Sequence, residues 1–494
     1  MGSISFLMPN PVPGAAQAAL RSACFATGYD QAPVPSVIEI HDNRLIVTKT
    51  LNESGYLLIP WPVGPFGTLV TATSTIRETD KPYRLLIELA RGKLNQVRSQ
   101  TAEWTAIGLR TPLNFDQGLS ETTKQFGRAL LAPATESDSP AARVLEQSFG
   151  LGDQLVREFI GQLLDTRHQD EGLLETRLAA RSASGPGASA TEYARSFNAA
   201  QVSLRWKDIE GEESRYDWSA PDRAVAAAKA ADLPLTIGPV IDLAPGMLPN
   251  WAAGWEGDLP TLAAFMCDFL ETAIARYKKD VRRWVVCAGF NHSDALGLGD
   301  DERLRLAFRL FEAATQIDPN LELVVSVAQP WGDYLKRAEH TISPLTFPDD
   351  LIRAGLKVSA VELEVRAGST PRGSLPRDLL DTARVLNLFS MLGLPLELCI
   401  SLPSSAGPDP HAEAHGQSVW APGWRAGPSV EGQAEWGASF AALGLCTPHV
   451  RAVTWDHWCD ADPHLTPNGG LLDASGQAKP LLSRLRSLRT AHLR

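Results

Sequence analysis

The feature that most constrains the fold is the apolar stretch VRRWVVCAGFNH at residues 281–292, which lies between two amphipathic segments. Its centre, residues 284–287, is continuously apolar, as expected for a strand that is covered on both faces. In residues 261–280, apolar side chains recur every three or four positions, which is typical of a helix. A second such segment, 302–320, leads into another apolar run at 321–329. This alternation predicts parallel strands joined by crossover helices.

The same alternation continues from about residue 173 to the end of the chain. Eight runs are predicted to be strands: 175–182, 198–206, 233–242, 282–289, 321–329, 357–365, 394–402 and 450–455. Eight strands with helices between them are what a closed (β/α)8 barrel, the TIM barrel, requires. We therefore predict an α/β barrel domain over residues 169–494. The aperiodic segment 403–429 interrupts it, and a loop of that length is usually functional or disordered.

The first 168 residues do not show this alternation. Strand-like runs cover 37–49, 55–63 and 67–76, and amphipathic helical segments cover 84–104 and 143–165. We predict a β-sandwich-like domain over residues 1–168 with helices that pack between it and the barrel, and a boundary between Asp165 and Glu175. Trp61 and Phe66 could bind carbohydrate there if they are exposed; the alternative is that both rings are buried in packing.

Composition and charge exclude several classes of protein. The chain has 494 residues with 44% hydrophobic and 21% charged residues, which is ordinary for a globular protein with a sizeable core. Its net charge of -11 argues against a nucleic-acid partner. We see no secretory signal and no run of membrane-spanning length, and the six cysteines make no close pair. We therefore expect a cytoplasmic protein without a membrane partner or a cofactor.

Four segments carry motifs that are shared with one known enzyme family: residues 276–291, 201–239, 247–251 and 452–482. They resemble glycoside hydrolase family 10, the xylanase family. RYKKDVRRWVVCAGFN (276–291) resembles the family's Tyr-containing helix that leads into a Trp-Asp-Val-Val-Asn-Glu strand. Residues 201–239 resemble its strand ending in Lys-Trp and the Glu-Pro-x-x-Gly segment that follows. Met247–Trp251 (MLPNW) resembles its Leu-Pro-x-Trp motif, and residues 452–482 resemble its last strand and Lys-Pro ending. The likeness covers about two thirds of the chain and implies a xylanase-like barrel.

The resemblance also implies where catalytic carboxylates should stand, and this chain departs from the family there. The family's acid/base Glu ends the fourth strand, at a position aligned with Ala288 and Gly289. Its nucleophile ends the seventh strand, where this chain has Cys399, Ile400 and Ser401. By this alignment both catalytic glutamates are replaced. The family's fold is therefore expected here, with carboxylates in other places.

The sixth predicted strand supplies the best replacement carboxylates. Glu362 and Glu364 are two residues apart, so both side chains face the same side of the strand. The corresponding family positions resemble a Gln-x-His pair that lines the sugar pocket. We predict catalytic roles for both glutamates, with Asp456 after the last strand as a partner. The alternative is a structural ion pair with Arg366 or Arg353.

Other polar and aromatic residues at predicted strand ends are candidates for substrate binding. They are Arg205, Trp206, Asp242, Asn291, His292, Trp331, Trp455 and His457. The tryptophans are expected to stack on sugar rings, whereas Asn291 could instead cap a helix. His411 and His415 have the spacing of a zinc pair, but they lie in a Pro/Gly-rich loop without the adjacent Glu, so no metal site is predicted.

The leading hypothesis is a glycoside hydrolase that acts on a plant-type or related polysaccharide or oligosaccharide through a rearranged carboxylate site. A catalytically inactive barrel that binds glycan is the first alternative, because both family catalytic positions lack a carboxylate. A lyase or another carbohydrate reaction is the second. The sugar, the stereochemical course and the oligomeric state stay open at this point.

Overall fold

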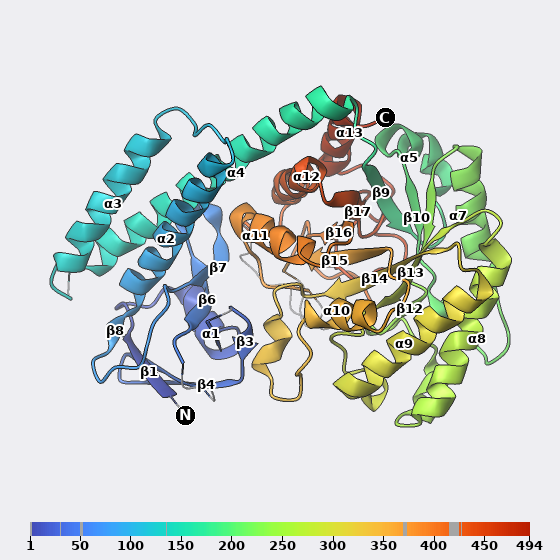
Figure 1. The fold of residues 1–494 in the computed structure, drawn as a ribbon, viewed down its shortest axis with the longest axis horizontal. Coiled ribbons are helices and arrows are strands. Elements are labelled where there is room, and N and C mark those ends of the chain that lie inside the picture. The colour runs from blue at the N-terminus through green and yellow to red at the C-terminus, as the bar shows by residue number, and fades with distance from the viewer. Residues whose placement is uncertain are drawn as a thin grey trace.

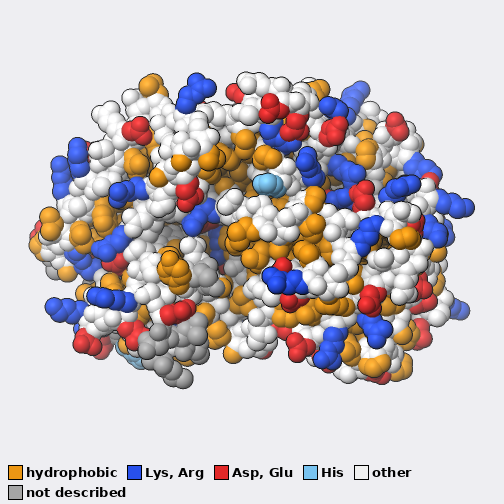
Figure 2. All heavy atoms as spheres, in the orientation of Figure 1, with side chains coloured by type: hydrophobic (Ala, Val, Ile, Leu, Met, Phe, Trp, Pro, Cys, Tyr) orange, Lys and Arg blue, Asp and Glu red, His pale blue; other side chains and the backbone are white. Residues whose placement is uncertain are grey.

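The structure is a computed structural model that describes residues 2–29, 31–49, 53–134, 136–368, 373–413, 424–425 and 427–494. Figure 1 shows two parts side by side, an N-terminal unit in blue to teal and a barrel in green to red. Figure 2 shows basic and acidic side chains interspersed over one face, with hydrophobic side chains gathered near its middle. Within the described ranges, no helix has both the length and the apolar character that crossing a membrane requires.

The second part is a closed parallel barrel, which confirms the predicted TIM fold. β9 pairs with both β10 and β17, and the chain of pairings returns through β13 to β11, so the sheet closes on itself. Its strands are β9 (Arg177–Ser182), β10 (Ala200–Val202), β11 (Leu235–Ile237), β12 (Ile241–Asp242), β13 (Arg283–Ala288), β14 (Glu322–Ala328), β15 (Ala360–Arg366), β16 (Leu396–Ser401) and β17 (Val450–Trp455).

The third barrel position consists of two short strands, β11 and β12, where the sequence predicts one. Pro239 between them has no N–H to donate to a neighbouring strand. Gly238 has a φ of 123°, and a Cβ there would lie 2.3 Å from the carbonyl oxygen of Val285. The chain can therefore approach β13 this closely only with glycine at this position.

Helices surround the barrel and follow the predicted rhythm. The predicted helices 261–280 and 302–320 are α8 and α9, and each buries one apolar face against the strands. The helices of this part are α5 (Ala190–Ser196), α6 (Trp206–Ile209), α7 (Ser219–Ala230), α8 (Leu259–Tyr277), α9 (Asp300–Ile317), α10 (Thr346–Arg353), α11 (Leu379–Ser390), α12 (Val430–Cys446) and α13 (Pro480–His492). Short 3₁₀ turns include η3 (Asn250–Trp255), η4 (Ala295–Gly297) and η5 (Asp333–Lys336).

The N-terminal unit contains two four-stranded sheets, in the orders β4-β5-β1-β8 and β3-β2-β6-β7. The strands are β1 (Gly2–Leu7), β2 (Phe25–Thr27), β3 (Pro33–Val34), β4 (Ser36–His41), β5 (Arg44–Lys49), β6 (Tyr56–Pro62), β7 (Thr68–Ala72) and β8 (Tyr83–Arg84), with α1 (Gly14–Ser22) and η1 (Gly64–Phe66) between them. Trp61 is buried in the core, and the ring of Phe66 lies under the Arg425 guanidinium. These contacts agree with the packing alternative for both rings.

Three helices complete this unit: α2 (Leu85–Ala106), α3 (Phe115–Leu131) and α4 (Asp138–Glu171). The helix α4 has 34 residues and reaches from the N-terminal unit to the barrel, where it contacts α11 and α12 (Figure 1). One continuous hydrophobic core runs through both parts. The predicted division at 168/169 falls inside the last turn of α4 and stays a prediction.

A buried ion pair links the two parts. Lys93 Nζ on α2 lies 2.5 Å from Asp378 Oδ2 at the start of α11, and both side chains are at most 10% exposed. Burial raises the pKa of Asp378, and the ammonium of Lys93 opposes that shift. The Asp378 carboxylate also accepts the Asp381 N–H at 3.0 Å and so caps α11.

We expect Lys93→Met to destabilise the protein by about 3–5 kcal/mol, because it leaves a buried carboxylate without its cation. Adding Asp378→Asn should restore part of this loss, since Asn removes the charge and still caps α11. Urea unfolding measures the free energy of unfolding of the single and the double variant. Lys229→Met is the matched control, because the Lys229–Asp280 pair is exposed and worth about 1 kcal/mol at most. A double variant as unstable as Lys93→Met would contradict the ion-pair explanation.

Candidate functional site

The predicted catalytic residues lie in a buried ionic network inside the barrel. The Arg181 guanidinium on β9 donates to Asp456 Oδ1 at 2.9 Å and to both oxygens of Glu362 at 3.1 Å. Arg366 on β15 donates to Asp456 Oδ2 at 2.7 Å and to Glu364. All five side chains are at most 6% exposed. Three carboxyl groups thus meet two guanidinium groups away from solvent.

The pKa values of Glu362 and Asp456 shift in opposite directions because the arginines are unevenly shared between them. Burial raises the pKa of Glu362, and Arg181 only partly offsets it while Glu397 and Glu364 add to it. Burial also disfavours the Asp456 carboxylate, but Arg366 and Arg181 outweigh this and hold its pKa well below the usual range. Ser326 Oγ lies 2.7 Å from Glu362 Oε1 and 2.9 Å from Glu364 Oε1, and its single O–H can donate to one of them at a time. Asp456 is therefore the firmly ionised member.

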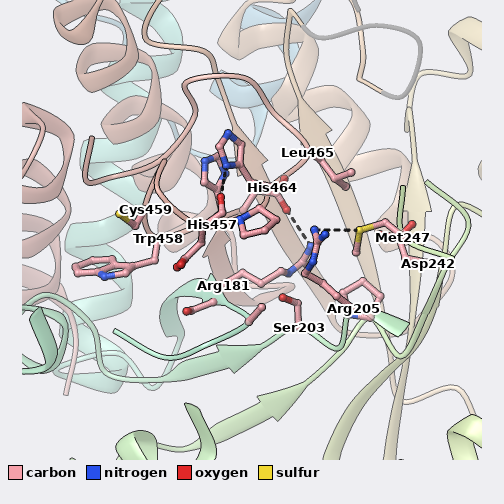
Figure 3. A pocket seen from close by; sticks show the side chains of 16 residues that line it. Arg181, Ser203, Arg205, Asp242, Met247, His457, Trp458, Cys459, His464 and Leu465 are labelled. Carbon is pink, nitrogen blue, oxygen red and sulfur yellow. Dashed lines mark hydrogen bonds and ion pairs between the residues drawn. The ribbon is translucent and has the colours of Figure 1, made fainter. Parts of the chain in front are cut away.

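A pocket lies above this network, at the carboxyl ends of the barrel strands, where TIM barrels hold their sites. Its empty space, counted together with the open solvent that adjoins it, is about 480 Å³. Arg181 and Ser182 end β9, Asp242 ends β12, and His457 follows β17; Figure 3 shows Arg181, Asp242 and His457 around it. The remaining lining residues are Ala183, Ser203, Arg205, Pro239, Met247, Asp456, Trp458, Cys459, Asp462, Pro463, His464 and Leu465.

Three buried polar atoms of the pocket wall have no hydrogen-bond partner among the described residues. They are Nε of Arg181, Oγ of Ser182 and Nδ1 of His457. A buried polar group without a partner costs about 1–3 kcal/mol, so such groups are few in folded proteins. One donor, one hydroxyl and one further ring nitrogen therefore belong to side chains of the same pocket wall and lack a partner there.

The two pocket histidines differ in charge: the ring of His464 is cationic and the ring of His457 is neutral. His464 Nε2 lies 2.8 Å from Asp409 Oδ2 and Nδ1 lies 2.6 Å from the Asp462 carbonyl, so both nitrogens face acceptors. Burial would lower the pKa of His464, but these hydrogen bonds raise it above the ordinary value. Burial, assisted by the charge of His464, lowers the pKa of His457 to about 4. The rings stack at 4.1 Å as one imidazolium and one neutral imidazole.

The same region contains a group with metal-ligand chemistry. Among the described residues, one ligand-type atom each of His457, Asp460 and His464 lies within 4.8 Å of the others. A cation is already present, however, because Lys479 Nζ lies 2.5 Å from Asp460 Oδ2. Both His464 nitrogens are also engaged as donors, so this group does not fit a metal ion. His415 of the sequence-level zinc pair lies outside the described residues.

Of the eight predicted substrate-binding residues, Arg205, Asp242 and His457 line the pocket. Arg205 also donates to Asp208 and Glu413, and Asp242 Oδ1 accepts the Ala244 N–H at 2.8 Å. Sequence reasoning did not single out Arg181 and Ser182, although they end the first barrel strand, the kind of position that identified the other residues. Their polarity at a strand end was the signal that could have found them.

The other five lie elsewhere. Trp206 and Trp455 are each 1% exposed, packed against Phe269 and Trp436, so neither presents a free ring face for stacking. The side chain of Asn291 joins β13 to β14 through the backbone of Ala328, rather than capping a helix. His292 stacks on Tyr334 with ring centres 4.6 Å apart, and Trp331 lies under the Arg377 guanidinium. Their roles in binding stay predictions.

Comparison with solved structures finds similarity to family 10 xylanases over about two thirds of the chain. Xylanase 10B from Thermotoga petrophila RKU-1 in complex with xylobiose has a TM-score of 0.48 and 15% identity, covering 68% of this chain and 97% of that one. The xylanase from Thermobacillus composti gives 0.45 and 18%, covering 66% and 99%. No protein-family model and no curated protein matches the chain.

We expect His457 to titrate near pH 4 and His464 above its ordinary value of about 6.5. NMR titration of the ring carbons, with His457→Gln and His464→Gln for assignment, measures both. Because burial lowers the pKa of His457, the unfolded chain binds a proton below pH 6.5 that the folded ring takes up only near pH 4, so the folded state loses stability as the pH falls from 6.5 to 4. His457→Gln should therefore lose less stability than the wild type between pH 6.5 and 4. If the stability of His457→Gln and of the wild type depends on pH with the same slope between pH 6.5 and 4, the lowered pKa assigned to His457 is wrong.

Proposed function

We propose that this protein binds a neutral oligosaccharide in the pocket at the carboxyl ends of β9, β12 and β17. The observation that supports this most is the set of unpartnered buried atoms, Arg181 Nε, Ser182 Oγ and His457 Nδ1. A sugar hydroxyl both donates and accepts, so neighbouring hydroxyl groups can satisfy such a mixed set. The alternatives of a purely apolar or an acceptor-only ligand leave His457 Nδ1 without a donor.

The charge distribution supports a neutral ligand. Arg181 and Arg205 line the pocket, but each already forms ion pairs with two carboxylates. Asp242 and Asp462 add acidic groups to the same wall. Positive and negative groups are therefore mixed at short range, without the unopposed cluster of arginines that selects phosphate or polyanions.

Matched serine substitutions test the proposal. Ser182 and Ser401 both end barrel strands with buried, unpartnered hydroxyl groups, but only Ser182 is part of the described pocket wall. Using the full chain, we expect calorimetry with xylo- and cello-oligosaccharides, followed by a wider glycan panel, to detect binding. Ser182→Ala should weaken it about fivefold, the value of one hydrogen bond, and Ser401→Ala should leave it unchanged. If no oligosaccharide binds the folded protein, the proposal is wrong.

A second candidate is glycoside hydrolysis by the buried carboxyl groups, with Glu362 or Glu364 as the acid/base and Asp456 as its partner. The observation that favours it is the pairing of a raised pKa at Glu362 with a lowered one at Asp456, which is how an acid and an anionic group are separated. Among the described pocket-lining residues, Asp456 is present and neither glutamate is. Hydrolysis at this site therefore needs the glutamates to become accessible to substrate.

We expect Glu362→Gln to lower any glycosidase activity of the purified protein by at least about 100-fold, because loss of a general acid costs that much. Glu397→Gln is the comparison variant: because Glu397 adds to the raised pKa of Glu362, it should shift the pH dependence of the rate without abolishing the activity. Glu397 is the neighbour of Glu362 in the β15–β16 register, but its carboxylate pairs with Arg283 instead. Rates on xylo-oligosaccharides and circular dichroism spectra should be compared. A folded Glu362→Gln protein with full activity would place catalysis elsewhere, and Asp456 would be tested next.

A further inference from the structure

The ring of His457 is fixed in place by contacts on three sides. His464 stacks on one face at 4.1 Å with an interplanar angle of 7°. A Cβ at Gly469 would lie 2.8 Å from His457 Cε1, so the backbone passes the ring too closely for any other residue. His457 Nε2 lies 3.3 Å from Asp460 Oδ1. The ring therefore has one defined orientation in the pocket wall.

Asp460 is itself held by cationic and backbone donors. Lys479 Nζ lies 2.5 Å from its Oδ2, and the Gly470 N–H lies 2.6 Å from its Oδ1. A Cβ at Gly470 would lie 2.6 Å from Asp460 Oδ1, so this close approach also requires glycine. Burial would raise the pKa of Asp460, but His457 and Lys479 lower it to about 2. The carboxylate is ionised and can only accept hydrogen bonds.

An acceptor-only neighbour determines where the neutral ring carries its proton. Because Asp460 can only accept, His457 must donate from Nε2. The proton is then absent from Nδ1, whose lone pair is buried without a partner among the described residues. A nitrogen lone pair binds a hydroxyl or N–H donor and repels a carbonyl or ether oxygen.

We propose that Asp460 is a positioning residue that fixes His457 as the Nε2–H tautomer, so that Nδ1 accepts a hydrogen bond from one hydroxyl group of the bound ligand. This inference rests on the proposed function and specifies it further. It names the ligand group that the pocket selects, a hydroxyl donor, and the residue that sets this preference without touching the ligand. Lys479 supports the arrangement through Asp460.

The wild-type tautomer is the first measurement, and it needs no substitution. In protein labelled with 15N at histidine, long-range 15N–1H spectra at pH 7 distinguish a protonated from an unprotonated ring nitrogen. We expect His457 to show a protonated Nε2 and an unprotonated Nδ1. A protonated Nδ1 overturns the inference, whatever the glycan experiments show.

Asp460→Asn is the second measurement. The charged ammonium of Lys479 should attract the amide oxygen more strongly than the Gly470 N–H does, so the NH2 group turns toward His457 at the cost of the Gly470 hydrogen bond. His457 Nε2 then becomes the acceptor and Nδ1 carries the proton. We expect the tautomer to switch and the affinity for the best oligosaccharide of the panel to fall about tenfold. Asp473→Asn is the matched control, because Asp473 lies in the same segment and accepts from Ser475 and Gln477. In this variant neither the tautomer of His457 nor the affinity for the oligosaccharide should change.

Gly469→Ala gives an independent variant, since the added methyl group presses on the His457 ring and on Thr466 and removes none of the polar groups around the ring. It should weaken binding and leave the proton on Nε2. If Asp460→Asn keeps both the wild-type tautomer and the wild-type affinity, the positioning role is overturned. If no oligosaccharide binds the wild type, the proposed function fails together with the hydroxyl assignment, and the tautomer spectra still decide separately whether Asp460 sets the ring.

Discussion

The interior of the barrel depends on the ion pairs of Arg181. This residue ends the first barrel strand, while its partners Asp456 and Glu362 come from the last strand's end and from the sixth strand. Removing one partner of a buried pair leaves a charge that costs about 3–5 kcal/mol. The guanidinium thus links the first and last barrel strands, β9 and β17, along the seam where they pair and close the sheet. The same side chain also lines the pocket, and its Nε is buried without a hydrogen-bond partner among the described residues.

The barrel could be predicted because its signal is periodic and local. Each strand is an apolar run and each helix has a regular apolar face, so eight strands could be counted without knowing any long-range contact. The third strand is split at Gly238 because the backbone of β13 passes very close to this residue. The local sequence pattern does not indicate such a contact between distant segments. The placement of α4 against α11 and α12 is likewise a tertiary property. The sequence indicates that the helix forms, and packing decides where it lies.

The site could be predicted in part. Alternation along β15 correctly placed Glu362 and Glu364 on one face, where both contact Ser326 inside the barrel. Their arginine partners, in contrast, include Arg181, which is 181 residues away from Glu362 in the chain. A strand-end position also does not tell whether an indole ring faces the pocket or the packed layer behind it. Trp455 packs against Trp436 because α12 covers that side.

Binding a sugar and hydrolysing it make different demands on the buried charged groups of this pocket. This difference decides which of the two functions the pocket fits better. In glycoside hydrolysis the acid/base carboxyl group exchanges a proton with the substrate, and its partner carboxylate acts on the sugar or on a water molecule, so both groups need access to the substrate. Asp456 is ionised, as a partner carboxylate must be, but guanidinium groups engage both of its oxygens, and neither Glu362 nor Glu364 is among the described residues that line the pocket. A hydrogen bond to the lone pair of His457 needs no change of charge at all. The ionic network that stabilises the barrel therefore favours a pocket that binds hydroxyl groups through neutral atoms at its edge.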